Sequence, residues 1–156
     1  MKCDIDGVVI RELTRYSDER GWLFELFRRD EIDQDIFPAM SYVSLTKPGV
    51  ARGPHEHREQ TDHFCFFGPS TFRLYLWDNR PDSPTKGKAF KLDAGEDKPL
   101  AVIVPPGVVH AYRNVGTVDG LVFNAPDELF MGEGKAQPVD EIRHEDDPNS
   151  PFKLDE

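Results

Sequence analysis

Residues 49–62 read GVARGPHEHREQTD and contain two of the five histidines of the chain, His55 and His57. On a β-strand, side chains two positions apart point to the same face of the sheet. A metal site or the wall of a pocket would use this spacing. A polar strand face that only contacts water would also accept it, so the pattern by itself leaves both interpretations open.

Short segments rich in aromatic and β-branched residues lie on both sides of this stretch, and several of them alternate in polarity. They are residues 7–13, 21–29, 40–47, 63–68, 71–78, 88–93, 100–105, 108–114 and 120–126. Clusters of Gly, Pro, Asn and Asp separate them, as turns require. The pattern predicts an all-β protein, an antiparallel sandwich or barrel. Only residues 29–37 have a short helical pattern.

The length of 156 residues favours a single domain. We expect a β-barrel domain over residues 1–130. Residues 131–156 are acidic, interrupted by prolines and nearly free of apolar periodicity, which indicates a loosely packed C-terminal extension or an arm that contacts a partner.

Charge and cysteine content exclude several classes of protein. The 29 acidic and 19 basic residues give a net charge of -10, which disfavours nucleic acid as a partner. Cys3 and Cys65 are too few for a disulfide framework, so we expect a reducing cytoplasm. No apolar run reaches the roughly 18 residues of a membrane helix, so we expect no membrane partner.

A second stretch, PPGVVHAYRN (105–114), places His110 after a Pro-Pro-Gly turn. With residues 49–62 it resembles the two sequence signatures of the cupin superfamily. The resemblance implies a double-stranded β-helix, the cupin jelly-roll barrel. In metal-binding cupins the matching positions supply two histidines, a carboxylate and a third histidine to one ion. Here they would be His55, His57, Asp62 (or Glu59) and His110, a set suited to Zn, Fe, Ni or Mn.

Four further stretches resemble one branch of this superfamily, the dTDP-4-dehydrorhamnose 3,5-epimerase family. They are DERGWLFELF (18–27), RGPHEH (52–57), DNRPDSPTKGK (78–88) and VPPGVVHAY (104–112), in the order and spacing of that family. The resemblance implies a cofactor-free enzyme acting on nucleotide-linked 4-keto-6-deoxyhexoses. A histidine removes the protons beside the C4 ketone, and a tyrosine reprotonates from the opposite face.

By position, the resemblance implies that His55 is the catalytic base. Neutral imidazole, with an ordinary pKa of about 6.5, accepts protons at neutral pH. The sugar nucleotide would be bound by arginines suited to diphosphate and by neighbouring polar groups. These substrate-binding residues are Arg20, Glu25, Arg52, Gln60 and His110.

Three family groups are not retained. Counting from Gln60, the position of a family lysine beside the enolate holds Asp62, whose charge would repel that oxyanion. The family tyrosine falls at about Glu128, and the aspartate that orients the catalytic histidine lies in a C-terminal segment that we expect this chain to lack.

These departures leave alternatives open. Tyr112 or Glu128 could be the acid of a single-centre epimerisation. A metal on the His/His/Asp/His set could replace the lysine, or the chain could be a non-catalytic sugar-binding cupin. Exposed jelly-roll edges predict a homodimer. In the resembling family, exchanged N-terminal strands would bring Arg20 and Glu25 into the partner's pocket.

Overall fold

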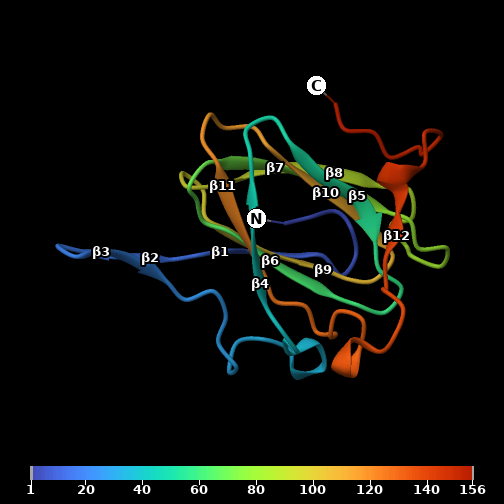
Figure 1. Cartoon of the computed structure of the whole chain (residues 1–156), viewed down its shortest axis with the longest axis horizontal. Coiled ribbons are helices and arrows are strands. Elements are labelled where there is room, and N and C mark those ends of the chain that lie inside the picture. The colour runs from blue at the N-terminus through green and yellow to red at the C-terminus, as the bar shows by residue number, and fades with distance from the viewer. Residues whose placement is uncertain (1, 156) are drawn as a thin grey trace.

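In the computed structural model, residues 2–155 are described, and they form two antiparallel five-stranded sheets that pack face to face, joined by turns and loops (Figure 1). In spatial order, the first sheet contains β1 (Val9–Glu12), β9 (Leu100–Val104), β6 (Asp62–Phe66), β11 (Gly120–Asn124) and β4 (Tyr42–Thr46). The second sheet contains β12 (Ile142–Arg143), β5 (Ala51–Glu56), β10 (Val108–Asn114), β7 (Thr71–Asp78) and β8 (Ala89–Gly95).

A separate hairpin, β2 (Arg15–Asp18) with β3 (Gly21–Phe24), extends from the barrel as an arm. Three short 3₁₀ turns complete the structure, η1 (Gln34–Ile36), η2 (Glu133–Lys135) and η3 (His144–Asp146). The jelly-roll fold is therefore confirmed. The helical pattern at 29–37 is reduced to the single turn η1, and β2, β5 and β12 lie outside the segments that the strand pattern indicated. Within residues 2–155, no helix is long and apolar enough to span a bilayer.

The core lies between the two sheets, because both alternate between inward apolar and outward polar residues. Phe64 and Phe66 of β6 face Phe72 of β7 and Tyr112 of β10, and their ring centroids lie 5.6–6.1 Å apart. Phe64, Phe66 and Phe72 are at most 2% exposed. Burying each such ring contributes roughly 2–3 kcal/mol, so this aromatic layer is a large part of the core.

The turn after β7 explains the motif DNRPDSPTKGK. The Asp78 carboxylate, which is buried, accepts hydrogen bonds from Arg80 Nε (2.8 Å), Ser83 Oγ (2.5 Å) and Thr85 Oγ1 (2.6 Å). The hydrogen bonds within this motif therefore stabilise the turn.

Gly53 allows β5 to approach β10 closely. Its φ of 82° is in the left-handed region, and a Cβ there would lie 2.5 Å from the carbonyl oxygen of His110. The register places His55 directly opposite His110. The glycine of the RGPHEH stretch thus positions two of the predicted site residues.

Cys3 and Cys65 are free thiols, and Cys65 is fully buried. The cytoplasmic location stays a prediction.

Candidate functional site

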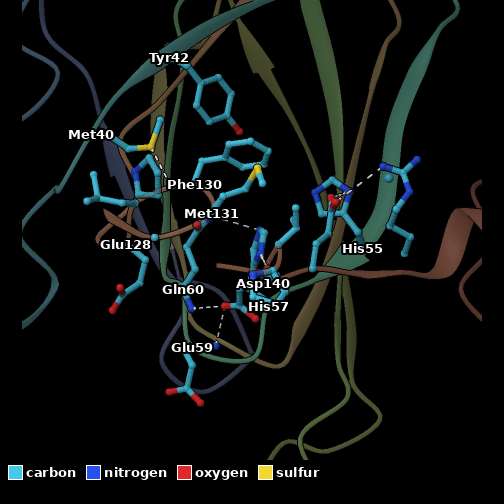
Figure 2. A pocket seen from close by; sticks show the side chains of 18 of the residues that line it. Met40, Tyr42, His55, His57, Glu59, Gln60, Glu128, Phe130, Met131 and Asp140 are labelled. Atoms are coloured by element: carbon cyan, nitrogen blue, oxygen red, sulfur yellow. Dashed lines mark hydrogen bonds and ion pairs between the residues drawn. The ribbon is translucent and has the colours of Figure 1, made fainter. Parts of the chain in front are cut away.

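A cavity of about 1210 Å³ opens between the two sheets, and Phe64 and Tyr112 of the aromatic layer form part of its lining (Figure 2). The second sheet supplies one wall through β5 and β10, and the first sheet supplies the other through β4. Residues 126–145 cover the mouth. The predicted site residues that line it are Arg52, His55, His57, Glu59, Gln60, Tyr112 and Glu128.

His55, His57 and His110 form one cluster at this wall. The ring centroid of His55 lies 4.6 Å from that of His110 and 5.8 Å from that of His57. Each of the three offers a ring nitrogen within 4.8 Å of the others, close enough to hold a metal ion together. The prediction that distant parts of the chain bring His55 and His110 together is confirmed.

His110 does not line the cavity, contrary to the expectation for a substrate-binding residue. It is 1% exposed and lies behind the wall, where its ring meets His55 on one side and Phe64 on the other. Its strand is the middle strand of the second sheet, so neighbours cover it on both sides. Within this cavity His110 can act through His55 rather than by touching a ligand.

Asp62 lies at the centre of the polar cluster and is fully buried. Its Oδ1 accepts hydrogen bonds from the side-chain amides of Gln60 (2.8 Å) and Asn124 (2.7 Å). Its Oδ2 lies 3.1 Å from His57 Nε2 and 3.2 Å from His110 Nε2. Burial raises the pKa of Asp62, but the two imidazoles outweigh it and hold the pKa well below the usual range. Asp62 is therefore an ionised carboxylate whose charge faces His57 at the cavity wall and His110 behind it.

The far nitrogens of His57 and His110 face backbone carbonyls. His57 Nδ1 contacts the carbonyl of Asp140, and His110 Nδ1 lies 3.1 Å from that of Val108. Burial opposes the charged form of His57, yet Asp62 and Asp140 together raise its pKa to about 9. His57 is therefore protonated at neutral pH.

His55 has the opposite protonation state. Burial, followed by repulsion from His110 and His57, holds the pKa of His55 well below its ordinary value. The His55 imidazole is therefore neutral at physiological pH, so one ring nitrogen has a lone pair that can accept a proton, while the lowered pKa by itself makes the group a weaker base.

The C-terminal segment packs onto this site, and the expected loose extension is corrected accordingly. β12 pairs with β5, with Arg143 opposite His55. The Asp140 carboxylate accepts hydrogen bonds of 2.8–3.0 Å from the backbone N–H groups of residues 58–60. The segment therefore forms part of the cavity. A domain boundary at residue 130 stays a prediction.

This segment also brings two carboxylates to the predicted base. Glu141 Oε1 lies 3.4 Å, and Glu145 Oε1 3.6 Å, from His55 Nδ1. These residues were missed because they lie in an acidic tail without periodicity. The loss of the family's own aspartate stays a prediction.

The other predicted residues divide into two groups. At the cavity wall, Arg52 donates from Nε to Thr46 Oγ1 (2.9 Å) and from Nη2 to the Leu45 carbonyl (2.9 Å), so its guanidinium is held in one orientation. Glu128 also lines the cavity, but its side chain points away from His55 in Figure 2. Arg20 lies on the arm, outside the cavity, where its exposed side chain pairs with Asp18.

Glu25 follows the arm and also lies outside the cavity. Its half-exposed carboxylate is 3.6 Å from Arg28. Arg20 and Glu25 therefore do not meet His55 within one chain.

Tyr42 was not predicted as a site residue, although it lines the cavity from β4. Its hydroxyl oxygen lies 3.0 Å from Asn124 Nδ2, which also donates to Asp62. The sequence did contain a signal for Tyr42, because Tyr42 and Ser44 are two positions apart on a predicted strand and therefore point to the same face of the sheet. Only the structure shows which face that is.

Comparison with known proteins was consistent with the motifs. The family model for dTDP-4-dehydrorhamnose 3,5-epimerase matches residues 2–128. The chain is 39% identical, over 129 residues and 81% of each protein, to the probable low-salt glycan biosynthesis epimerase Agl13 of Haloferax volcanii. It is 40% identical over 112 residues to the spore coat polysaccharide biosynthesis protein SpsL of Bacillus subtilis, covering 72% of this chain and 73% of SpsL.

Among solved structures, the dTDP sugar isomerase of Desulfovibrio desulfuricans G20 has a similar fold. Its TM-score is 0.81 at 24% identity, covering 96% of this chain and 91% of that one. The family match ends at residue 128, before the segment that brings Glu141 and Glu145 to His55.

Proposed function

The chain belongs to the dTDP-4-dehydrorhamnose 3,5-epimerase family, and from that membership we propose that it epimerises a dTDP-linked 4-keto-6-deoxyhexose at C3, C5 or both. One observation carries the proposal. His55 is a neutral imidazole on the wall of a cavity large enough for a sugar nucleotide, with two carboxylates beside it.

The chemistry follows from the C4 ketone. A C–H bond beside a ketone is acidic because the electron pair left behind spreads onto the carbonyl oxygen as an enolate. His55 accepts that proton as a general base. Glu141 and Glu145 then stabilise the imidazolium, in place of the family's single aspartate. The fixed guanidinium of Arg52 provides a cation for a phosphate oxygen.

Solvent exchange tests this proposal. The protein is mixed in D₂O with a dTDP-4-keto-6-deoxyglucose sample, and deuterium at C3 and C5 is followed by NMR. We expect uptake well above the protein-free rate, because only proton abstraction exchanges those hydrogens. Binding of the nucleotide sugar without any exchange would instead support a non-catalytic sugar-binding cupin.

A metal-dependent activity is a second candidate, supported by buried atoms in the histidine cluster. Asp62 Oδ2 and His110 Nε2 are both buried, and neither has a hydrogen-bond partner among residues 2–155. Imidazoles whose far nitrogens face carbonyls are typical metal ligands. His55, His57 and His110 lie close enough together to share a divalent ion such as Zn, Fe, Ni or Mn, and Asp62 lies beside two of them. A bound ion would supply a Lewis acid for the enolate oxygen.

Elemental analysis of the purified protein decides between metal and no metal. If the second candidate is right, we expect about one equivalent of metal per chain, lost when His57 and His110 are both replaced by alanine. His144→Ala is the matched control, because His144 contacts Glu56 outside the cavity and should leave the metal content unchanged. Metal at background level in the unaltered protein would contradict this candidate.

We also propose that two chains form a homodimer through the arm and the outer face of the first sheet. Trp22 and Leu23 on the arm are each 55% exposed, and Val43 and Leu45 on β4 are 60% and 50% exposed. Apolar side chains exposed together favour a protein interface. The resemblance implies exchanged arms, which would bring Arg20 into the partner's cavity.

Sedimentation analysis checks the dimer. We expect a mass of about twice the 17.8 kDa of one chain, and a shift to monomer in Leu23→Glu. Val118→Glu introduces the same charge at an equally exposed residue on the β10–β11 turn and should leave the dimer intact. A monomeric unaltered protein at micromolar concentration would refute the assembly.

A further inference from the structure

Inversion of a sugar carbon needs two groups on opposite sides of the ring. The base removes the proton from one face, and an acid must deliver a proton to the other, or the original configuration returns. This requirement rests on the proposed function. In this protein, the base and the acid would lie on the two opposing walls of the cavity.

His55 and Tyr42 lie on different walls. His55 is on β5 of the second sheet, whereas Tyr42 is on β4 of the first sheet, and both line the same cavity. Figure 2 shows them on opposite sides of the open space, with the Tyr42 hydroxyl directed into it. A hexose between the two sheets would therefore present one face to each residue.

Hydrogen bonding leaves the Tyr42 proton available. Asn124 Oδ1 accepts from the backbone N–H of His63 (2.9 Å), which fixes the orientation of the amide. Its Nδ2 then donates one hydrogen to Asp62 and the other to the Tyr42 oxygen. Tyr42 is thus the acceptor in that bond, and its own hydrogen can point into the cavity. The same bond would stabilise the phenolate left after proton transfer.

The charge state agrees with this geometry. Desolvation, followed by the nearby Asp62 carboxylate, raises the pKa of Tyr42 above its ordinary value of about 10, although Asn124 opposes the shift. The phenol therefore holds its proton at neutral pH.

The other candidate acids fit less well. Tyr112 is on β10, the neighbour of β5 in the second sheet, so it shares a wall with His55. Its hydroxyl is paired with Ser44 Oγ at 3.1 Å, and its ring packs into the aromatic layer. The side chain of Glu128 is exposed and points away from the space between His55 and Tyr42.

We infer that Tyr42 is the acid that completes the inversion, in place of the family tyrosine whose position falls at about Glu128. His55 takes the C–H proton, and the bonding pair moves through the C3–C4 or C4–C5 bond onto the ketone oxygen. As the enolate collapses, its electron pair forms a new C–H bond with the Tyr42 proton on the opposite face. The phenolate and the imidazolium then return to their starting states by proton exchange with water.

The test separates proton exchange from inversion. Tyr42→Phe removes only the hydroxyl, and folding is checked by circular dichroism and thermal unfolding. In D₂O with dTDP-4-keto-6-deoxyglucose, we expect inverted product to form roughly 100-fold more slowly, as loss of a general acid predicts. Deuterium uptake with retained configuration should fall by less than about 5-fold, because His55 can return a deuteron to the face it attacked.

Tyr75→Phe is the matched control, since Tyr75 lies on the outer face of β7 and its hydroxyl contacts the Asp155 carbonyl. It should change neither rate. Unchanged inversion in Tyr42→Phe, or an equal loss of exchange and inversion in the folded variant, would overturn the inference. So would a selective loss of inversion in Tyr112→Phe instead. If the unaltered protein exchanges no deuterium, the proposed function itself fails, which is a different result.

Discussion

His55→Asn is expected to lower the rate of deuterium exchange at C3 and C5 by roughly 1,000-fold, within the range that general-base catalysis contributes. Asparagine occupies a similar volume at the cavity wall but cannot accept the proton. Because His55 faces the cavity while His57 and His110 are turned towards Asp62, neither neighbour can replace it. The measurement is the exchange assay at saturating substrate, with bound substrate determined separately.

His63→Asn is the matched control for this prediction. His63 is buried like the site histidines but packs against Phe27 of the segment after the arm. Both of its ring nitrogens lack a hydrogen-bond partner among residues 2–155, so the substitution removes no bond. Its exchange rate should match that of the unaltered protein. Exchange in His55→Asn within 10-fold of the unaltered rate would contradict the role of His55 as base.

Metal content is measured in the same preparations. If the rate of His55→Asn falls only in proportion to a loss of bound metal, the result favours the metal-dependent candidate rather than proton abstraction by His55. A 1,000-fold loss without any change in metal content favours the base.

Asp78→Ala is expected to destabilise the folded protein by about 3 kcal/mol. The substitution leaves Arg80, Ser83 and Thr85 without their shared acceptor in a partly buried turn. The free energy of unfolding is measured from urea denaturation at pH 7. Asp93→Ala is the matched control, because Asp93 pairs with Arg73 through two similar bonds at the surface. Exposed pairs contribute about 0–1 kcal/mol, so its effect should be small.

The Asp78 contribution should also depend on pH. Hydrogen bonds from Arg80, Ser83 and Thr85 hold the pKa of Asp78 below its unfolded value of about 3.9. A depressed pKa in the folded state stabilises the fold above the unfolded pKa, and the stabilisation is lost as the pH falls below it. The difference in unfolding free energy between the unaltered protein and Asp78→Asn should therefore shrink between pH 5 and pH 3. A difference that stays constant over this range would contradict the linkage.

Much of the architecture follows from local sequence pattern. Alternation with a period of two residues fixes which side chains share a face, and clusters of Gly and Pro mark where strands end. The predicted strands at 71–78, 100–105, 108–114 and 120–126 therefore match β7, β9, β10 and β11 closely. The helical pattern at 29–37 yields only the single 3₁₀ turn η1, in which no residue is buried.

From the sequence alone, strand periodicity predicted an all-β sandwich or barrel, and the resemblance of its motifs implied the jelly-roll fold, the family and the meeting of His55 with His110. Only the tertiary structure decided that His110 lies behind the wall, that Glu141 and Glu145 approach His55, and that Tyr42 faces it from the other sheet. Local pattern gives each strand an inner face, but it does not say which strands oppose one another. The contact of His57 with Asp140 joins residues 83 positions apart. Such contacts arise only when packing of the whole core brings separate strands and the C-terminal segment around one cavity.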